Sequence, residues 1–298
     1  MPNKDRYTLI VNPISGKKTS LAMLETIKPL FTKAGAEIEI LITSHAGHAS
    51  ELAASIDLGR TRFLCVMGGD GTVHEVINGL MKRPDPRSHP IALIPAGTGN
   101  TVLQHFAGNN PILATQRILQ GNTIPLDLAR VKLNDKIVFS LNIVGWGAID
   151  DINQKAEAWR RLGSPRYALA ALAYILSPKS RKAIITIDDT RLEDEFLMAA
   201  ACNTRFTGKG MQLAPKANAA DGKLDIIIVR RASRLQMLSL FLRVFNGSHL
   251  DLPFVEYTQA RSLEISYTEN AGLTLDGERT NGTSVSVNII PAALNIIV

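Results

Sequence analysis

The sequence predicts two domains of different fold class: an α/β domain with a parallel sheet over residues 1–128, and a mostly antiparallel β domain over residues 129–298. In the first part, short apolar runs alternate with helix-like segments, and glycine-rich turns follow several of these runs. After Pro125 the pattern changes to strand-like runs with few helical interruptions. At 298 residues, the chain is long enough for each domain to have its own core.

In the first domain, the alternation of strand-like and helix-like segments indicates β-α-β units. This order favours a parallel sheet covered by helices, and ligands of such sheets bind at the carboxyl ends of the strands. The expected strands lie at 7–11, 37–43, 62–67 and 91–94, and the expected helices at 20–34, 48–55 and 73–81.

In the second domain, strand follows strand, and Asn134-Asp135 is a hairpin signal between two of them. Helical interruptions are expected near 151–176 and 232–247. The last strand, near 292–298, is a candidate to return to the first domain. The expected strands lie at 129–133, 136–144, 183–187, 196–203, 224–229, 262–267, 273–275, 283–290 and 294–298.

The composition is that of a soluble globular protein, with 45% hydrophobic and 20% charged residues. The first residues have no signal-peptide core, and no apolar stretch reaches the roughly 18–20 residues of a membrane span. We therefore expect a cytoplasmic protein. Cys65 and Cys202 lie inside apolar runs and are expected to be buried free thiols, because a disulfide framework needs more cysteines and a secreted context.

The excess positive charge is concentrated in one segment, residues 152–182. A solvated basic face and contact with an anionic surface both fit this pattern. Only 5% of the residues are aromatic and no nucleic-acid-binding motif is present, so lipid is favoured over nucleic acid. The segment holds one acid, Glu157, and seven basic residues: Lys155, Arg160, Arg161, Arg166, Lys179, Arg181 and Lys182.

The turn at 68–72, Gly-Gly-Asp-Gly-Thr, follows a predicted buried strand and precedes a predicted helix. Glycine lets the backbone approach a polyphosphate, and a helix N-terminus offers free N–H groups to anionic oxygens. Asp70 inside such a turn would repel phosphate unless a cation or a substrate hydroxyl lies beside it. It therefore indicates Mg²⁺ binding or proton handling, and the sequence leaves both open.

Two further turns follow predicted strands of the same domain. The turn at 95–100, Pro-Ala-Gly-Thr-Gly-Asn, again combines small residues, a hydroxyl and a helix start. The turn at 12–16, Asn-Pro-Ile-Ser-Gly, is not a Walker P-loop, because Val11 stands where that motif requires its first glycine. Asn12 and Ser15 are nevertheless placed to reach a nucleotide. The alternative for this turn is a plain strand ending.

Two motifs of the second domain carry carboxylates. Asp276 and Glu278 flank Gly277, and such a pair can position and deprotonate a hydroxyl, although this sequence is also a common exposed turn. In the segment 213–225, carbonyls and a carboxylate in a tight turn can hold a hard cation, and a plain hairpin turn is the alternative.

Together these motifs resemble the diacylglycerol kinase catalytic-domain family, which includes bacterial lipid kinases, sphingosine kinases and ceramide kinases. Four elements agree in order: NPxSG at 12–16, GGDGTxxEVxNGL at 68–80, PxGTxN at 95–100 and LDGE at 275–278. The segment 214–225 is similar to the family turn that ends in DG.LD. His74 departs from the pattern, because many bacterial relatives have Asn there.

The resemblance implies an NAD kinase/diacylglycerol kinase-like fold, with ATP between the two domains. It implies that Glu278 accepts the proton of a lipid hydroxyl, assisted by Asp276. It also implies a structural Mg²⁺ held by Asn218, Asp221 and the backbone carbonyl of Lys223, because an ammonium group has no lone pair to give. The implied nucleotide-binding residues are Asn12, Thr43, Gly68, Gly69, Asp70, Gly71, Thr72, Val73, His74 and Thr98.

The expected activity is transfer of the γ-phosphate of ATP to an aliphatic hydroxyl of a lipid, with the protein in peripheral contact with an anionic membrane. NAD kinase is the enzyme alternative, because it shares the GGDGT turn. A nucleotide-binding regulator without turnover is the other alternative, and the presence of both Asp70 and the DGE pair argues against it. The sequence does not distinguish among diacylglycerol, a sphingoid base, phosphatidylglycerol and a polyprenol, and it leaves the oligomeric state open.

Overall fold

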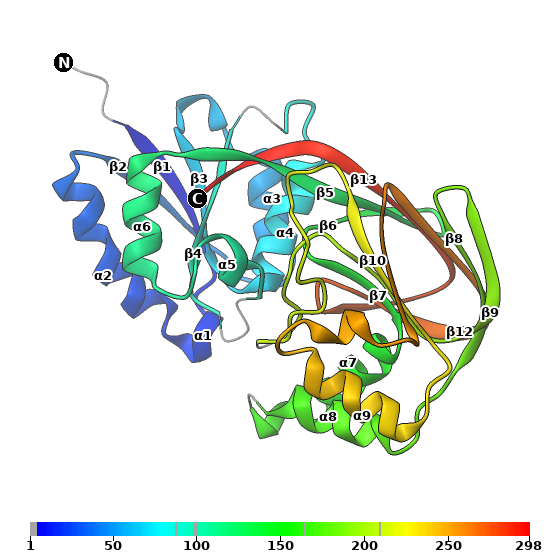
Figure 1. The fold of residues 1–298 in the computed structure, drawn as a ribbon. Coiled ribbons are helices and arrows are strands. Elements are labelled where there is room, and N and C mark those ends of the chain that lie inside the picture. The colour runs from blue at the N-terminus through cyan, green and yellow to red at the C-terminus, as the bar shows by residue number, and fades with distance from the viewer. Residues whose placement is uncertain (1–4, 87–88, 98–100, 164, 209) are drawn as a thin grey trace. The chain divides into compact units, whose positions relative to one another are not determined.

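The computed structural model describes residues 5–86, 89–97, 101–163, 165–208 and 210–298. The chain forms two compact units (Figure 1). Unit 1 comprises residues 1–127 and 291–298, and unit 2 comprises residues 128–290. An α/β unit is thus followed by a mainly antiparallel β unit, which confirms the predicted fold class at that level.

Unit 1 contains a sheet whose neighbouring strands all pair in parallel. The strand order is β2-β1-β3-β4, and the end of β13 lies beside β4. The strands of this unit are β1 (Arg6–Val11), β2 (Glu37–Ile42), β3 (Phe63–Gly68) and β4 (Ile91–Pro95). The helices are α1 (Ser15–Lys18), α2 (Ser20–Lys33), α3 (His48–Ser55), α4 (Asp70–Leu80), α5 (Thr101–Phe106) and α6 (Pro111–Gln120), with a 3₁₀ turn η1 (Leu58–Arg60).

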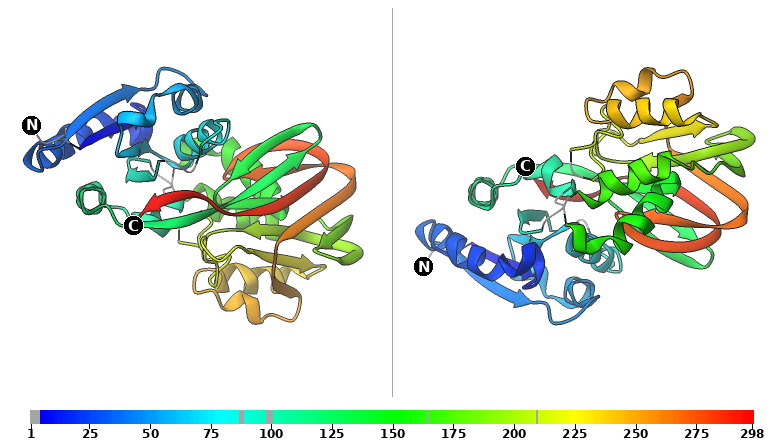
Figure 2. Two further views of the ribbon diagram at one scale, coloured as in Figure 1. Left: turned by 90° about the horizontal axis from the view of Figure 1, so that it is seen from above. Right: turned by 90° about the horizontal axis from the view of Figure 1, so that it is seen from below.

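Helices cover both faces of this sheet (Figures 1 and 2). Helices α2 and α6 pack on one face, where Phe31 and Ile118 join alternate residues of the strands in a single core. Helices α3 and α4 pack against each other, and α4 contacts β3. Successive side chains of a strand point to opposite faces, so strands buried on both faces are apolar throughout. Strand β3 is such a strand, because all of its residues are buried.

In unit 2 the paired strands run antiparallel. Its strands are β5 (Thr123–Leu133), β6 (Lys136–Ser140), β7 (Ile143–Gly147), β8 (Arg181–Ile187), β9 (Thr190–Cys202), β10 (Leu224–Arg230), β11 (Val255–Ala260), β12 (Ser262–Leu275) and β13 (Glu278–Ile297). Its helices are α7 (Ala148–Ala158), α8 (Arg166–Ile175) and α9 (Arg234–Arg243), with 3₁₀ turns η2 (Arg160–Leu162) and η3 (Ser248–Asp251).

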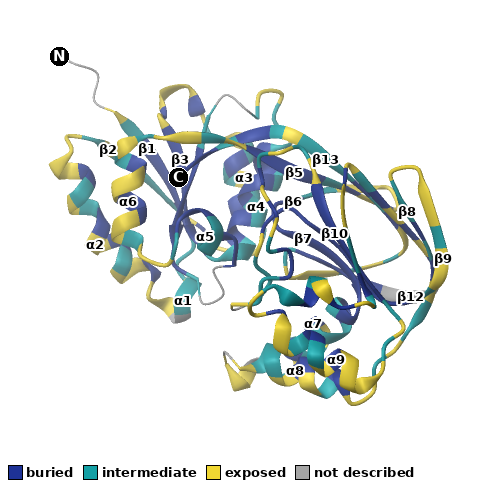
Figure 3. Ribbon diagram, viewed as in Figure 1, coloured by how far each residue is buried: buried dark blue, intermediate teal, exposed yellow. Residues whose placement is uncertain are grey.

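Two cores lie within unit 2. One is formed by strand side chains alone and is centred on Trp146 and Phe196. The other lies between the strands and the helices, where Tyr174 of α8 and Met237 of α9 meet alternate residues of β9 and β10. Figure 3 shows that the sheet-facing parts of these elements are buried and that the outer faces of α8 and α9 are largely exposed.

Several element boundaries differ from the sequence predictions. The helical stretch expected at 151–176 is two helices, because Gly163, with φ +70°, and Pro165 interrupt it before α8. The strands expected at 262–267 and 273–275 form one strand, β12. The last two predicted strands also form one, β13, whose end belongs to unit 1. Apolar periodicity in the sequence indicates a strand where one of its faces is buried. Hydrogen bonds to neighbouring strands extend β12 and β13 through polar residues, where this periodicity is lost.

Candidate active site

The glycine-bearing turns of unit 1 follow β1, β3 and β4, which are neighbours in the parallel sheet. The Asn12 side-chain amide donates to Thr72 Oγ1 at 3.0 Å, and the Asn12 backbone N–H donates to the Met67 carbonyl at 3.0 Å. The Ala96 backbone N–H donates to the Gly68 carbonyl at 3.0 Å. These contacts bring the three turns to one edge of the sheet.

Gly16 shows how closely two of these turns approach each other. Its φ of +62° lies in the left-handed region, and a Cβ added there would lie 2.3 Å from the Ala96 carbonyl oxygen. A side chain at this position would therefore be strained and would also push the 12–16 turn away from β4.

Helix α4 begins at Asp70, three residues earlier than the sequence predicts, so Asp70, Gly71 and Thr72 form its first turn. Gly69 is the N-cap and provides no side-chain hydrogen bond. The first N–H groups of a helix have no acceptor within the helix, and the helix dipole makes this end attractive to anions. The GGDGT segment is thus the N-terminus of a helix that starts at the carboxyl end of a central strand.

The Asp70 carboxylate bonds to the start of α5. Its two oxygens accept hydrogen bonds from the backbone N–H groups of Thr101, at 2.8 Å, and Val102, at 3.1 Å. Asp70 therefore caps the helix that follows the second glycine-rich turn. This contact gives Asp70 a structural role that the sequence reasoning did not include.

Glu75 has a similar role on the other side of α4, and the sequence reasoning did not assign it one. Its carboxylate accepts from the backbone N–H groups of Gly47, at 2.9 Å, and Ala49, at 3.2 Å, and so caps α3. The predicted nucleotide ligand Thr43 follows β2 directly, before the loop that leads to α3. Thr43 is buried, and its backbone N–H donates to the Val11 carbonyl. A glutamate in the first turns of a helix after a glycine-rich turn is the only sequence signal for this contact.

His74 and Thr98 are two further predicted nucleotide ligands. His74 lies on α4, and its ring nitrogen Nε2 is 3.3 Å from the Asn78 side-chain amide nitrogen. Thr98 lies outside the described residues.

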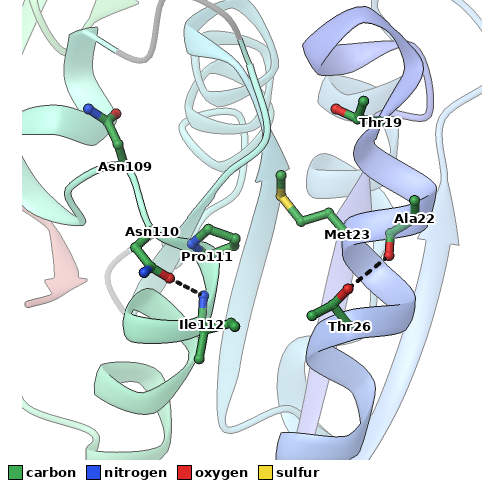
Figure 4. A pocket seen from close by; sticks show the side chains of 8 residues that line it. All are labelled: Thr19, Ala22, Met23, Thr26, Asn109, Asn110, Pro111 and Ile112. Atoms are coloured by element: carbon green, nitrogen blue, oxygen red, sulfur yellow. Dashed lines mark hydrogen bonds between the residues drawn. The ribbon is translucent and has the colours of Figure 1, made fainter.

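An open groove of about 450 Å³ lies elsewhere in unit 1, between α2 and the start of α6. Figure 4 shows the side chains that line it. It is lined by residues such as Met23, Thr26 and Pro111. None of the predicted site residues lines it.

In unit 2, Asp276 and Gly277 form the two-residue turn between β12 and β13, where Leu275 pairs with Glu278. Their φ angles are +51° and +93°. Positive φ at both positions is typical of a type I′ hairpin turn, for which Asp-Gly is a preferred sequence.

The Asp276 carboxylate is held by the connection between β6 and β7. Its Oδ1 accepts hydrogen bonds from the Ser140 hydroxyl at 2.6 Å and from the backbone N–H groups of Asn142 and Ile143 at 2.9 and 3.0 Å. Its Oδ2 accepts from the Leu141 N–H at 3.0 Å. Hydrogen bonds to the ionised form make a carboxylate a weaker base. These four contacts suit a residue that positions the turn.

Glu278, two residues further on, is exposed. Its carboxylate makes no hydrogen bond or ion pair with any residue that the structure describes. Of the two acids in the motif, Glu278 is therefore the one whose lone pairs are available to a substrate.

Helix α7 fixes the hairpin from its other side. The Asn153 side-chain amide donates to the Gly277 carbonyl at 2.9 Å. Asp150, of which 2% of the side chain is exposed, accepts from Arg279 Nε at 3.1 and 3.0 Å. Burial raises the pKa of Asp150 above its ordinary value, and hydrogen bonding and charge from Arg279 oppose this shift. Neither Asp150 nor Asn153 was singled out from the sequence, because their partners lie more than 100 positions away.

The predicted cation turn of unit 2 is exposed and folded on itself. Asn218 Oδ1 accepts from the Ala220 N–H at 3.2 Å, and Asp221 Oδ1 accepts from the Lys223 N–H at 3.0 Å. Close by, Asp225 is buried and accepts from the Tyr257 hydroxyl at 2.7 Å. Burial raises the pKa of Asp225, and the charge of Asp221 raises it further. A second negative charge close to Asp225 makes this an environment that suits a cation.

Within the described residues, no group of three or more His, Cys, Asp or Glu side chains is arranged to hold a metal ion. The predicted turn would instead combine an amide oxygen, a carboxylate and backbone carbonyls, which are ligands that hard cations accept. Cys65 and Cys202 are buried free thiols, and burial raises the pKa of both. None of the described helices has the length and apolar content that crossing a membrane requires.

Comparison with known proteins defines the class to which this architecture belongs. Residues 6–131 match the diacylglycerol kinase catalytic domain, and residues 142–298 match the YegS C-terminal NAD kinase beta sandwich-like domain. The chain belongs to the diacylglycerol kinase catalytic-domain family.

Individual relatives agree with this assignment. A diacylglycerol kinase of Mycobacterium tuberculosis (strain ATCC 25618 / H37Rv) is 27% identical, over 98% of this chain and 94% of its own. Sphingosine kinase 1 of Homo sapiens is 27% identical, over 98% of this chain and 90% of its own. The chain spans 63% of the length of sphingosine kinase 1 from Arabidopsis thaliana, to which it is 28% identical over 86% of this chain.

The fold also has a solved counterpart. A crystal structure of a Bacillus anthracis str. Sterne protein superposes with a TM-score of 0.82 at 24% identity, covering 100% of this chain and 96% of the other. At this level of identity the likeness concerns the fold.

Proposed function

We propose that the protein is an ATP-dependent lipid kinase that transfers the γ-phosphate to an aliphatic hydroxyl of a lipid. The observation that carries the proposal is the convergence of three turns at the carboxyl ends of β1, β3 and β4, with the N-terminus of α4 at their centre. Phosphoryl transfer depends mainly on positioning and on stabilising charge, and this edge of the sheet offers both.

In this proposal, the turns of unit 1 hold the nucleotide. The α4 N-terminus receives the phosphates, and Asp70 keeps the start of α5 next to them by capping it. Asp70 is also the proposed contact for a Mg²⁺ ion on the nucleotide. The nucleotide-binding residues are Asn12, Thr43, Gly68, Gly69, Asp70, Gly71, Thr72, Val73, His74 and Thr98.

Glu278 is the proposed proton acceptor for the lipid hydroxyl. An aliphatic hydroxyl is a weak nucleophile, so a positioned carboxylate assists its in-line attack on the γ-phosphorus. The carboxylate of Glu278 makes no hydrogen bond or ion pair with the described residues, which supports this role. The four hydrogen bonds of Asp276 support a positioning role for that residue. Transfer requires the hydroxyl beside Glu278 and the phosphate on the unit 1 turns to meet.

We infer that the 218–223 turn holds a structural Mg²⁺ through Asn218, Asp221 and the Lys223 backbone carbonyl. Two features support the fit: the turn exposes oxygen ligands, and the charges of Asp221 and Asp225 lie close together. When bound, the ion would supply positive charge beside these carboxylates. The test is thermal unfolding with and without Mg²⁺, where wild type should be stabilised and Asp221→Asn should not.

The acceptor lipid would be met at an anionic membrane surface. The basic segment at 152–182 supports this only in part, because two of its arginines are paired within the protein. Arg181 contacts both oxygens of Asp151 at 2.8 Å, and Arg166 contacts Glu157 at 2.9 Å.

The decisive experiment is phosphate transfer from γ-labelled ATP to a panel of acceptors in mixed micelles with Mg²⁺. The panel holds diacylglycerol, sphingosine, phosphatidylglycerol, a polyprenol and NAD. We expect label in at least one lipid and none in NAD. Label in NAD alone would establish the NAD kinase alternative. ATP binding without transfer to any acceptor would favour a regulator.

A further inference from the structure

Helices α8 and α9 each have a stripe of leucines on the outer face. On α8 and the residue after it, Leu169, Leu172 and Leu176 are exposed by 41%, 41% and 68%. This i, i+3, i+7 spacing places the three side chains on one face of a helix. Figure 3 shows these outer faces as exposed.

The stripe on α9 has the same spacing. Leu235, Leu238 and Leu242 are exposed by 80%, 36% and 63%, and Phe245 extends the row beyond the helix end with 41% exposed. Single exposed apolar side chains are common on protein surfaces, whereas a contiguous row of them indicates an interaction site.

The two stripes belong to one part of unit 2, because α8 and α9 contact each other. Their inner faces are already used: Tyr174 and Ile175 of α8, and Met237 and Leu240 of α9, are buried in the core against the sheet. We call the outer leucines of both helices, with Phe245, the α8–α9 face. Leu162, in the turn η2 before α8, is a further exposed leucine. With it, eight exposed large hydrophobic side chains of the described residues lie on or next to these two helices: Leu162, Leu169, Leu172, Leu176, Leu235, Leu238, Leu242 and Phe245.

The segments that carry the α8–α9 face are rich in positive charge, although Glu157 pairs with Arg166 of α8 and Asp251 lies in η3, which contacts α9. Residues 158–187 and 226–250 contain no Asp or Glu, although they include ten Lys and Arg residues. Several of these cations are exposed and form no ion pair with the described residues: Arg161, Lys179, Arg234 and Arg243.

We propose that the α8–α9 face is a docking surface for an anionic lipid bilayer. Exposed leucines beside unpaired cations match the two parts of such a bilayer, because apolar side chains enter the acyl boundary while Lys and Arg meet the headgroup phosphates. A second copy of the chain is a poorer occupant, since symmetric packing of this face would bring its cations against one another.

The docking surface connects to the proposed catalytic hairpin through hydrogen bonds. Tyr167 of α8 donates from its hydroxyl to Asn153 Oδ1 at 3.4 Å, and the Asn153 amide donates to the Gly277 carbonyl at 2.9 Å. The inference that docking positions the catalytic hairpin rests on the proposed lipid kinase activity. The binding itself rests on the exposed leucines and the cations.

The test is sedimentation of the full chain with vesicles in the absence of ATP. The vesicles are phosphatidylcholine alone or phosphatidylcholine with a minority of phosphatidylglycerol. The variant Leu176→Gln/Leu235→Gln/Leu242→Gln changes the three most exposed leucines of the face, and Leu21→Gln/Leu113→Gln/Ile137→Gln is the control, at 42%, 50% and 48% exposed. We expect binding to the anionic vesicles to fall about tenfold or more in the first variant and to stay unchanged in the control.

A second variant, Arg234→Gln/Arg243→Gln, tests the charge. It should weaken binding to anionic vesicles and reduce the loss of binding caused by added salt. Wild type that fails to bind anionic vesicles, or a leucine variant that binds like wild type, would overturn the proposal. So would a wild-type dimer in sedimentation velocity that the leucine variant converts to a monomer. Vesicle binding without phosphate transfer in any assay would refute the lipid kinase proposal and leave the docking surface standing.

Discussion

In both the glycine-rich turns of unit 1 and the hairpin of unit 2, an aspartate accepts hydrogen bonds from backbone N–H groups. The hairpin also carries a glutamate, Glu278, that accepts none from the described residues. Asp70 accepts two backbone N–H groups and caps α5, and Asp276 accepts three backbone N–H groups and a serine hydroxyl. Glu278 makes no such contact with the described residues. Asp70 and Asp276 thus hold the turns in place, whereas Glu278 is the acid that the proposed function uses as a base.

The two aspartates differ in how far their contacts reach. Asp70 bonds to residues 31 and 32 positions away, within one α/β unit. Asp276 bonds to residues 133 to 136 positions away, so it ties the hairpin to a connection formed much earlier in the chain. The hairpin therefore depends on the assembled β unit for its position.

Replacing the free acid should have the largest effect. Glu278→Gln keeps the size of the side chain and removes the base, so phosphate transfer should fall about 10²–10⁴-fold. ATP binding, measured by calorimetry, should match wild type, and so should the free energy of unfolding. Glu193→Gln, which changes another exposed glutamate, is the control. Transfer at the wild-type rate by Glu278→Gln would remove Glu278 from the proposed mechanism.

Replacing the bonded acid should act mainly on stability. Asp276→Asn turns an NH₂ group toward N–H donors, so urea unfolding should show a loss of about 1–3 kcal/mol. Transfer should fall as well, because Glu278 lies on the same turn. The exposed Asp189 provides the matched control, Asp189→Asn. An Asp276→Asn protein as stable as wild type would mean that the four contacts do not hold the hairpin.

The smallest expected effect is a dependence of stability on pH at Asp225. Burial raises its pKa in the native state, so the native protein keeps this proton to higher pH than the unfolded chain does. The stabilising contribution is full below the unfolded pKa of about 4 and is lost as pH rises through the native pKa. In chelator, the unfolding free energy of Asp225→Asn should change less with pH over this range than that of wild type. Identical pH profiles would contradict the assignment.

The sequence identified the β-α order of the first unit because buried parallel strands are continuous apolar runs, such as β3. It also located the glycine-rich turns, since glycine is required where two backbones approach as closely as Gly16 and Ala96 do. It missed the start of α4 at Asp70, because glycines obscure a helical pattern. It also divided β12 and β13, whose pairing partners lie elsewhere in the chain.

By itself the sequence determined which groups are present: the phosphate-type turns, the DGE motif and the basic segment at 152–182. Local chemistry fixes these features, because glycine, turn residues and charge act through near neighbours. Only the tertiary structure decided which of them are engaged. Asp70, Asp276 and Arg181 are bonded to other residues, whereas Glu278 and Arg234 make no hydrogen bond or ion pair with the part of the chain that the structure describes. Most of these partners lie tens to more than a hundred residues away, so folding alone brings them within hydrogen-bonding distance.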